Sequence, residues 1–121
     1  MEKIKVMVVD DDRSIWELVN VALPDKSFEK FYSETGADAV RMFPVWAPDV
    51  VMLDIYLPDI TGVDVLKRLQ AMAHGVRPKF IMLTSISNRH EIMNCIKLGV
   101  SGYVIKPFDA ETLQLQVMKY L

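Results

Sequence analysis

The sequence lacks the features that define several protein classes. Its 121 residues include one cysteine, Cys95, so no disulfide bond can form within the chain. Its apolar runs are too short to span a membrane, and its first residues lack the long apolar segment of a secretory signal. The formal net charge is −2 and Lys and Arg form no run, which argues against direct nucleic-acid binding. We therefore expect a cytoplasmic protein that binds neither nucleic acid nor membrane.

What the sequence does contain is a regular alternation of two apolar patterns. Short apolar runs predict β-strands at residues 4–9, 28–32, 50–54, 79–83 and 102–105. Helical spacing predicts helices at residues 14–23, 37–43 and 62–73, from Ser87 or Asn88 to Leu98, and from Asp109 to the end. Pro44 is expected to close or kink the second helix, and His74-Gly75 to stop the third. This alternation predicts one α/β domain over residues 1–121, with a five-stranded parallel sheet covered by helices on both faces.

The segment at residues 50–54 is the centre of this pattern. Four apolar residues, Val50 to Leu53, end in Asp54, which is typical of a strand that is buried on both faces and ends in an acid. Burying a lone carboxylate is costly. The carboxyl edge of a central parallel strand is different, because open α/β sheets bind their ligands there. We therefore expect Asp54 to be the chemical centre of the chain.

Other predicted strands also end in polar residues. These are Asp10, Asp11 and Asp12 after the first strand, Thr84 and Ser85 after the fourth, and Lys106 after the fifth. Each of them alone could be a solvated loop residue. Together they bring carboxylates, hydroxyls and an ammonium group to one edge, because parallel strands all end on the same side of a sheet. Chance would scatter polar types among the strand ends, so the joint pattern indicates a functional site.

Four motifs, in order along the chain, resemble those of a known family. They are Val-Val-Asp-Asp at 8–11, Leu-Asp-Ile-Tyr-Leu-Pro-Asp-Ile-Thr-Gly at 53–62, Leu-Thr-Ser at 83–85 and Gly-Tyr-Val-Ile-Lys-Pro-Phe at 102–108. At these spacings, essentially the whole chain resembles the receiver domain of two-component response regulators, such as the chemotaxis regulators. The resemblance implies a flavodoxin-like (βα)5 fold with strand order 2-1-3-4-5. It also implies a phosphorelay function, in which a sensor histidine kinase or a histidine phosphotransfer protein donates a phosphoryl group.

The resemblance assigns roles around Asp54. Asp54 would accept the phosphoryl group, so the domain would catalyse only its own phosphotransfer and dephosphorylation. Asp11, Asp54 and the backbone carbonyl of Tyr56 would bind Mg²⁺ directly, and Asp10 would act mainly through a bound water. Asp12, just past these acids, is expected to be a loop residue or a helix N-cap. The chemistry of the residues agrees, because crowded carboxylates repel one another unless a cation neutralises them, and Mg²⁺ prefers hard oxygen ligands.

A second group of residues would respond to phosphorylation. Lys106 would act as a movable positive charge on the phosphoryl oxygens, and the Thr84 hydroxyl would donate to one of them. Ser85 is small, as suits a residue beside that group. The resemblance implies that Thr84 swings in while Tyr103 turns from exposed to buried, which is a population shift between two states. It also predicts a cis peptide bond between Lys106 and Pro107.

Two positions beside the site, Tyr56 and Ile86, bear on the lifetime of the phosphorylated form. In the family these positions tune how fast the phosphoryl group is lost to water. Here they are aromatic and aliphatic, so neither readily orients an attacking water and both could shield the group. We therefore expect a relatively long-lived phosphorylated state. The alternative is that both are merely half-exposed loop residues.

The expected partners besides the phosphodonor are an output domain or a target protein. In the family, the fourth helix, fifth strand and fifth helix form the usual dimer or output surface, and a homodimer through this surface is a further expectation. Leu115, His90 and Lys119 are therefore the residues to examine. Trp16 lies off the apolar stripe of its helix and Leu115 opposite that of the last helix, so each is either a partner contact or an isolated surface residue. The chain would be a single-domain shuttle or the N-terminal part of a longer regulator.

Two other functions remain open. Residues 10–14, Asp-Asp-Asp-Arg-Ser, resemble the nucleophile motif of haloacid-dehalogenase-type phosphatases, which would make Asp10 the nucleophile of an enzyme. That interpretation lacks a later acidic pair for the metal and leaves the loop after Asp54 unexplained. A third candidate is an interaction module on a receiver scaffold that works without phosphorylation. The aspartate that takes up phosphate or beryllofluoride distinguishes the first two.

Overall fold

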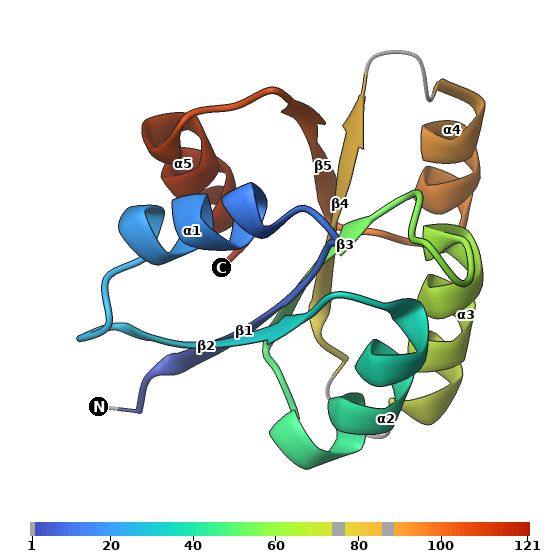
Figure 1. Cartoon of the computed structure of the whole chain (residues 1–121), viewed down its shortest axis with the longest axis horizontal. Coiled ribbons are helices and arrows are strands. Elements are labelled where there is room, and N and C mark those ends of the chain that lie inside the picture. Colours follow the sequence, from blue (N-terminus) through green and yellow to red (C-terminus); the bar gives the residue numbers. More distant parts are fainter. Residues whose placement is uncertain (1, 74–76, 86–88) are drawn as a thin grey trace.

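The computed structural model describes residues 2–73, 77–85 and 89–121, and strands and helices alternate along them (Figure 1). The strands are β1 (Ile4–Val9), β2 (Phe28–Ser33), β3 (Val50–Asp54), β4 (Lys79–Ser85) and β5 (Gly102–Lys106). The helices are α1 (Arg13–Ala22), α2 (Gly36–Trp46), α3 (Gly62–Met72), α4 (Arg89–Lys97) and α5 (Ala110–Tyr120). No helix in these ranges combines the length and the apolar character that crossing a bilayer requires.

The strands form one parallel sheet in the order β2-β1-β3-β4-β5, which confirms the predicted fold. β3 lies in the middle, paired with β1 and β4. Helices α1 and α5 cover one face of the sheet, and α2, α3 and α4 cover the other (Figure 1). Covering both faces removes β3 from water, and all five of its residues are buried.

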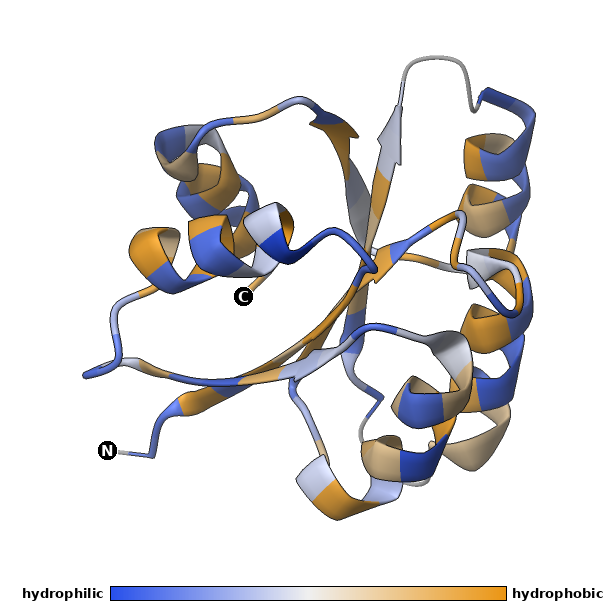
Figure 2. Cartoon of the chain, viewed as in Figure 1, coloured by the Kyte–Doolittle hydropathy of each residue, from blue (hydrophilic) through white to orange (hydrophobic). Residues whose placement is uncertain are grey.

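The sheet separates two apolar layers. Successive strand residues point to opposite faces, so Val8 and Met52 belong to the layer under α1 and α5, whereas Met7 and Leu53 belong to the layer under the other three helices. Figure 2 shows apolar colouring on the central strands and on stretches of the helices. Each fully buried side chain of this size contributes about 1.5–3 kcal/mol to folding. The sheet is therefore a firm support for the loops at its carboxyl edge.

Polar side chains fix where the helices next to that edge begin. Asp12 is the N-cap of α1, as predicted, and Asp109 is the N-cap of α5. Thr35 and Thr61 cap α2 and α3 in the same way. Each cap accepts a backbone N–H of the first turn, which has no partner within the helix. The caps therefore set the length and path of the loops that leave the strands.

The prediction that the second helix ends at Phe43 is wrong, because α2 continues to Trp46 with Pro44 inside it. A proline within a helix removes one N–H donor and crowds the preceding turn. The added turn brings the ring of Trp46 onto Phe31, with ring centroids 4.9 Å apart, against the core. This packing offsets the cost of the proline. The helix ends at Ala47, which takes the left-handed conformation with φ 45°.

Trp16 also differs from the expectation that it lies off the buried stripe of its helix. It is half-buried, and its ring stacks on Tyr32 with centroids 5.0 Å apart and an interplanar angle of 10°. Tyr32 lies near the end of the edge strand β2, and its ring extends the core beyond the buried stripe of α1. Trp16 therefore packs against the core and is not an isolated surface residue. Leu115 is 63% exposed, as predicted. The expected helix stop at His74-Gly75, the cap at Ser87 or Asn88, and Ile86 lie outside the described residues.

Candidate functional site

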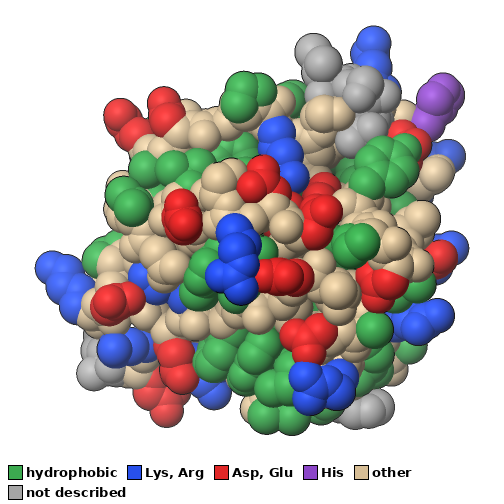
Figure 3. Space-filling model, viewed as in Figure 1, with side chains coloured by type: hydrophobic (Ala, Val, Ile, Leu, Met, Phe, Trp, Pro, Cys, Tyr) green, Lys and Arg blue, Asp and Glu red, His purple; other side chains and the backbone are tan. Residues whose placement is uncertain are grey.

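The ends of β1, β3 and β5 bring three kinds of polar side chain to one place. Asp10 and Asp11 follow β1, Asp54 ends β3 and Lys106 ends β5. One carboxylate oxygen from each aspartate lies within 4.8 Å of the others. Asp10 is fully buried and Asp54 is 9% exposed, whereas Asp11 is exposed. Figure 3 shows acidic side chains next to lysine or arginine side chains near the middle of the face in view.

Lys106 bridges the two buried carboxylates. Its Nζ donates to Asp10 Oδ2 at 2.7 Å and lies 3.5 Å from Asp54 Oδ2. Burial lowers the pKa of Lys106, but the hydrogen bond and the negative charges of these carboxylates outweigh burial, so the pKa is raised overall. The lysine is therefore held in its charged form between the two acids.

The backbone fixes Asp10 in this arrangement. Its other carboxylate oxygen accepts the N–H of Asp12 at 2.9 Å, and its own N–H donates to the carbonyl of Ser33 at 3.1 Å. With its backbone N–H and its Oδ1 bonded in this way, the carboxylate points Oδ2 toward Lys106. Asp10 is thus a fixed negative charge beneath the site, and Asp54 and Asp11 lie nearer to solvent.

The surroundings of Asp54 disfavour its charged form. Burial first and the negative charge of Asp10 second raise the pKa of Asp54 to about 6, although Lys106 and the backbone N–H of Tyr56 act in the opposite direction. That N–H lies 3.4 Å from Asp54 Oδ1. One lysine does not balance three carboxylates, so the cluster is short of positive charge. A second cation would relieve this imbalance.

The donor set suits a hard divalent cation. Within the described part of the chain, Asp10, Asp11 and Asp54 are the group of acidic, histidine or cysteine side chains close enough together to share an ion. Carboxylate oxygens from only a few residues, with an exposed side open to water, match the preference of Mg²⁺ for oxygen ligands and retained waters. The residues present therefore fit the predicted metal.

The loop after β3 closes against the site through its backbone. Ile55 donates its N–H to Leu83 of β4 at 3.2 Å, and its carbonyl accepts the N–H of Gly62 at 2.6 Å. A Cβ atom on Gly62 would lie 2.1 Å from the Asp54 carbonyl oxygen, so only glycine permits this approach. Tyr56 and Thr61 form an antiparallel bridge inside the loop. The start of α3 is therefore anchored directly on the backbone of Asp54.

Asp59 ties the same loop to the neighbouring helix. Its two carboxylate oxygens accept the N–H groups of Gly36 and Ala37, at 2.9 and 2.8 Å, in the first turn of α2. These two bonds hold the pKa of Asp59 below its usual range, and the bond from Ala37 has the larger effect. Sequence reasoning missed this contact, because the partners are 22 and 23 positions away and lie at the start of another helix.

Comparison with known proteins agrees with this geometry. The sequence model described as "Response regulator receiver domain" matches residues 6–118. The chain belongs to the response regulator receiver domain family. It is 30% identical over 117 residues to regulatory protein AtoC of Escherichia coli (strain K12), a match that covers 97% of this chain and 25% of AtoC. The receiver domain thus spans about a quarter of the length of that relative.

Another relative and a solved structure match over nearly their whole length. The receiver domain is 29% identical over 117 residues to sporulation initiation phosphotransferase F of Bacillus subtilis (strain 168), covering 97% of this chain and 93% of that protein. The structure of chemotaxis response regulator CheY4 of Vibrio cholerae superposes with a TM-score of 0.87 at 28% identity, covering 99% of this chain and 100% of that one. These likenesses favour the receiver interpretation over the phosphatase alternative.

The residues expected to respond to phosphorylation lie on the two neighbouring strands β4 and β5. Thr84 is 2% exposed, and its hydroxyl donates to the carbonyl of Ser85 at 3.1 Å. Tyr103 is 42% exposed on β5. The Lys106–Pro107 peptide bond is cis, as predicted. In this structure the Thr84 hydroxyl is therefore turned to the backbone, and the Tyr103 side chain is directed outward.

One side-chain contact, which no pattern in the sequence indicates, links the site to α4. The hydroxyl of Tyr56 donates to Glu91 Oε1 at 2.5 Å. The bond raises the pKa of Tyr56 and lowers the pKa of Glu91, because it favours the protonated phenol and the ionised carboxylate. No sequence signal could have found it, since the residues are 35 positions apart and the direction of Tyr56 depends on the path of the loop.

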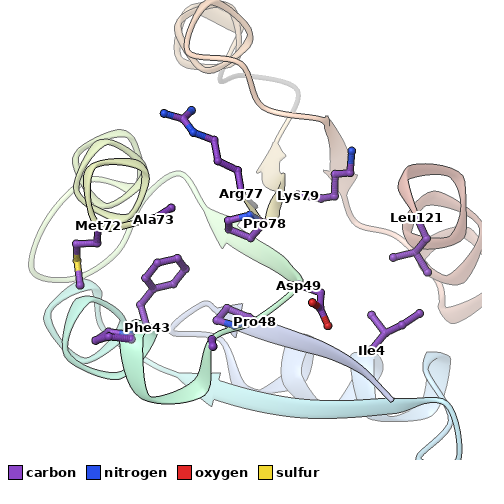
Figure 4. A pocket seen from close by; sticks show the side chains of 12 residues that line it. Ile4, Phe43, Pro48, Asp49, Met72, Ala73, Arg77, Pro78, Lys79 and Leu121 are labelled. Atoms are coloured by element: carbon purple, nitrogen blue, oxygen red, sulfur yellow. The ribbon is translucent and has the colours of Figure 1, made fainter. Parts of the chain in front are cut away.

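The opposite edge of the sheet carries a cavity of different character. It has a volume of about 560 Å³ and lies at the amino ends of the strands (Figure 4). Its walls are mostly apolar side chains, and the charged residues among them are Asp49, Arg77 and Lys79. Asp49 accepts the backbone N–H of Lys5 at 2.9 Å, so its carboxylate already has a structural role. The chemistry of the receiver domain is therefore concentrated at the carboxyl edge.

Proposed function

We propose that this receiver domain accepts a phosphoryl group on Asp54 from the phosphohistidine of a sensor histidine kinase or a histidine phosphotransfer protein. The observation that carries the proposal is the position of Asp54, at the open edge of a rigid central strand, beside Lys106 and two further acids. In the transfer, a carboxylate oxygen of Asp54 forms the new bond to phosphorus as the bond from phosphorus to the histidine nitrogen breaks. The work of the site is to position these groups and to stabilise charge.

Asp11, Asp54 and the backbone carbonyl of Tyr56 would hold Mg²⁺, with Asp10 acting through a bound water. When bound, the ion neutralises charge on the transferring oxygens. Asp10 also keeps Lys106 charged and aimed along the cluster, at 2.7 Å. When a phosphoryl group arrives on Asp54, Lys106 can turn from the carboxylate to the phosphoryl oxygens, because a lysine acts as a point charge on a flexible stem.

Thr84 and Tyr103 would carry the signal outward. A phosphoryl group adds a charge of about −1.5 to −2 and strong acceptor oxygens. The Thr84 hydroxyl would exchange its bond to the Ser85 carbonyl, now 3.1 Å, for one to a phosphoryl oxygen. The space it leaves would admit the Tyr103 ring, which shifts the population toward an inward state. The reciprocal effect is that a partner selecting the inward ring favours phosphorylation.

The surface that would respond is formed by α4, β5 and α5. Its exposed apolar residues are Met93, Ile96, Tyr103, Ile105, Leu115 and Met118. A group of exposed apolar residues of this kind is typical of an interaction site. An output domain, a target protein or a second copy of the chain would bind here, with Lys119 and His90 at its margins. Binding to a kinase and to such partners would place the protein in the cytoplasm.

The phosphorylated form should be relatively long-lived. Tyr56 follows the acceptor by two positions and has no amide or acid with which to orient a water. Phosphate release measured for the wild type and for Tyr56→Asn tests this. The asparagine variant should lose phosphate faster, and a slower variant would contradict the expectation.

The identity of the acceptor decides the function. The protein is incubated with Mg²⁺ and either acetyl phosphate or beryllofluoride, and the modified aspartate is located by mass spectrometry or NMR. Modification of Asp54, lost in Asp54→Asn, supports the receiver function. Modification of Asp10 would support a phosphatase instead. A protein that takes up neither reagent would be an interaction module that works without phosphorylation.

A further inference from the structure

Tyr56 is held at two ends. At the backbone, its N–H lies 3.4 Å from Asp54 Oδ1, and the residue pairs with Thr61 across the loop. At the far end of the side chain, its hydroxyl donates to Glu91 in the first turn of α4 at 2.5 Å. A side chain fixed at both ends has one orientation. The ring therefore extends from the loop that follows Asp54 to α4.

Glu91 is the contact that fixes the outer end. The residue Tyr56 is 52% exposed, so packing alone does not hold its ring. The stacked aromatic pairs of the described residues are Trp16–Tyr32 and Phe31–Trp46, and neither includes Tyr56. A hydrogen bond from a neutral hydroxyl to a carboxylate is about twice as strong as one between neutral groups. Without Glu91, the ring would be free to rotate into solvent.

We propose that Glu91 is a positioning residue that holds the Tyr56 ring beside Asp54 and thereby slows hydrolysis of the phosphoryl group. The proposal rests on the proposed function of Asp54. In hydrolysis, a water oxygen bonds to phosphorus, the bond from phosphorus to the Asp54 oxygen breaks, and the carboxylate departs while the proton of the water passes to phosphate or solvent. A ring held at the loop reduces the directions from which that water can approach.

The position of Glu91 on α4 gives this contact a second consequence. Any partner that displaces the first turn of α4 also releases the Tyr56 hydroxyl, and so shortens the life of the phosphorylated state. A partner that holds this turn in place prolongs it. The coupling is reciprocal in free energy, because the same bond contributes to the stability of α4 in its present position.

The test is the rate of phosphate loss from the full chain. The wild type and each variant are phosphorylated with radiolabelled acetyl phosphate and Mg²⁺, the donor is removed, and the remaining label is followed. Glu91→Ala should speed the loss about three- to tenfold, the range for losing one hydrogen bond. Tyr56→Phe, which keeps the ring and removes the hydroxyl, should match it. Glu91→Gln should restore much of the slow rate, because its amide oxygen can still accept the bond.

Two comparisons separate positioning from a general loss of structure. In the Tyr56→Phe background, Glu91→Ala should add nothing further, because the bond is already absent. Glu111→Ala is the control, since Glu111 likewise lies in the first turn of a helix, α5, is exposed, and should leave the rate unchanged. Glu91→Ala should lower the unfolding midpoint no further than Tyr56→Phe, since both lose the same bond; a larger fall would attribute the faster loss to a weaker fold.

Other outcomes would overturn the proposal. If Glu91→Ala loses phosphate at or below the wild-type rate, Glu91 does not position the ring. If it speeds the loss equally in the wild-type and Tyr56→Phe backgrounds, it acts on another group. If the wild type takes up no phosphoryl group at all, the receiver function itself fails, and this proposal fails with it.

Discussion

Helices α3 and α4 cover the same face of the sheet, and each follows a strand that ends at its carboxyl edge, yet they are held very differently. Four residues of α3 are buried, including Val65, Leu66 and Leu69 with no exposed surface. In α4, Cys95 alone is buried. Since apolar burial supplies most of the stability of a packed helix, α3 is a fixed part of the scaffold and α4 is a lightly held one.

The links from these helices to the site differ in the same way. α3 begins at Gly62, whose backbone packs on Asp54 and donates to Ile55. α4 contacts the site loop through one bond between the side chains of Tyr56 and Glu91. A backbone link of this kind breaks only when the strand moves, whereas a side-chain bond can break by a single rotation. Of the two helices, α3 therefore has the firmer link to the site.

The largest expected effect comes from removing the carboxylate of Asp54, which lies just before the loop to which both helices are linked. Asp54→Asn should abolish phosphoryl uptake completely and leave the fold intact, because an amide cannot supply the anionic oxygen that attacks phosphorus. Hydrogen exchange should then show that acetyl phosphate changes the protection of α4 amides in the wild type and not in the variant. Asp49→Asn, at the opposite edge of the sheet, is the control and should take up phosphoryl groups normally. If Asp54→Asn still took up phosphoryl groups, the acceptor would have to be another residue.

The next effect is the difference in stability between the two helices. Leu66→Ala in α3 should lower the free energy of unfolding by about 2–5 kcal/mol, because it leaves a cavity in a fully buried position. Ile96→Ala in α4, where the side chain is 50% exposed, should change it by about 0.5 kcal/mol or less. Urea unfolding measures both. Similar losses for the two variants would show that α4 is packed as firmly as α3.

A smaller effect, with a definite sign, follows from the pKa of Asp54, which burial and the charge of Asp10 raise to about 6. Without metal, the folded protein holds this proton more tightly than the unfolded chain, so stability falls as pH rises between about 4 and 6. The size of the pKa shift limits this loss of stability to about 3 kcal/mol. Because water has partial access to Asp54, we expect a loss of about 1–2 kcal/mol. In EDTA, Asp54→Asn should exceed the wild type in stability by this amount near neutral pH and approach it in acid. Equal stability at both pH values would refute the shift.

The smallest effect belongs to Asp59, on the same loop, and it has the opposite pH dependence. The backbone N–H groups of Ala37 and Gly36 lower the pKa of Asp59, so its contribution to stability is present above the pKa of the unfolded chain and is lost as pH falls through the folded value. Asp59→Asn should lower the urea midpoint slightly near neutral pH, by less than Leu66→Ala. The deficit should shrink in acid, and a deficit that grows there would contradict the assignment.

Much of the site was predictable because parallel strands all end on one side of a sheet. That rule, with buried strands recognised from their apolar runs, is enough to bring Asp10, Asp54 and Lys106 together without any knowledge of distances. The family resemblance then added the strand order and the cis bond before Pro107, both of which the structure confirms. It also gave roles to Thr84, which remain proposals.

What could not be predicted depends on side-chain directions in loops and at edges. The helical period places Trp16 off the buried stripe, but Tyr32 on the edge strand extends the core to meet it. Local propensity ends the second helix before Pro44, but the packing of Trp46 on Phe31 outweighs that preference. The bond between Tyr56 and α4 follows from the path of a loop, which no periodicity in the sequence describes.

The single cysteine gives the lightly held helix an intrinsic chemical probe. Cys95 has no exposed surface, and burial raises the pKa of its thiol, with the charge of Glu91 acting in the same direction. A thiol reagent can therefore react only when α4 lifts from the sheet. Because the chain has no other thiol, the rate of modification is a direct clock for that opening, read without any label or mutation. A protein whose α4 stays packed would not react with the reagent, and each opening of α4 would allow one thiol to be modified.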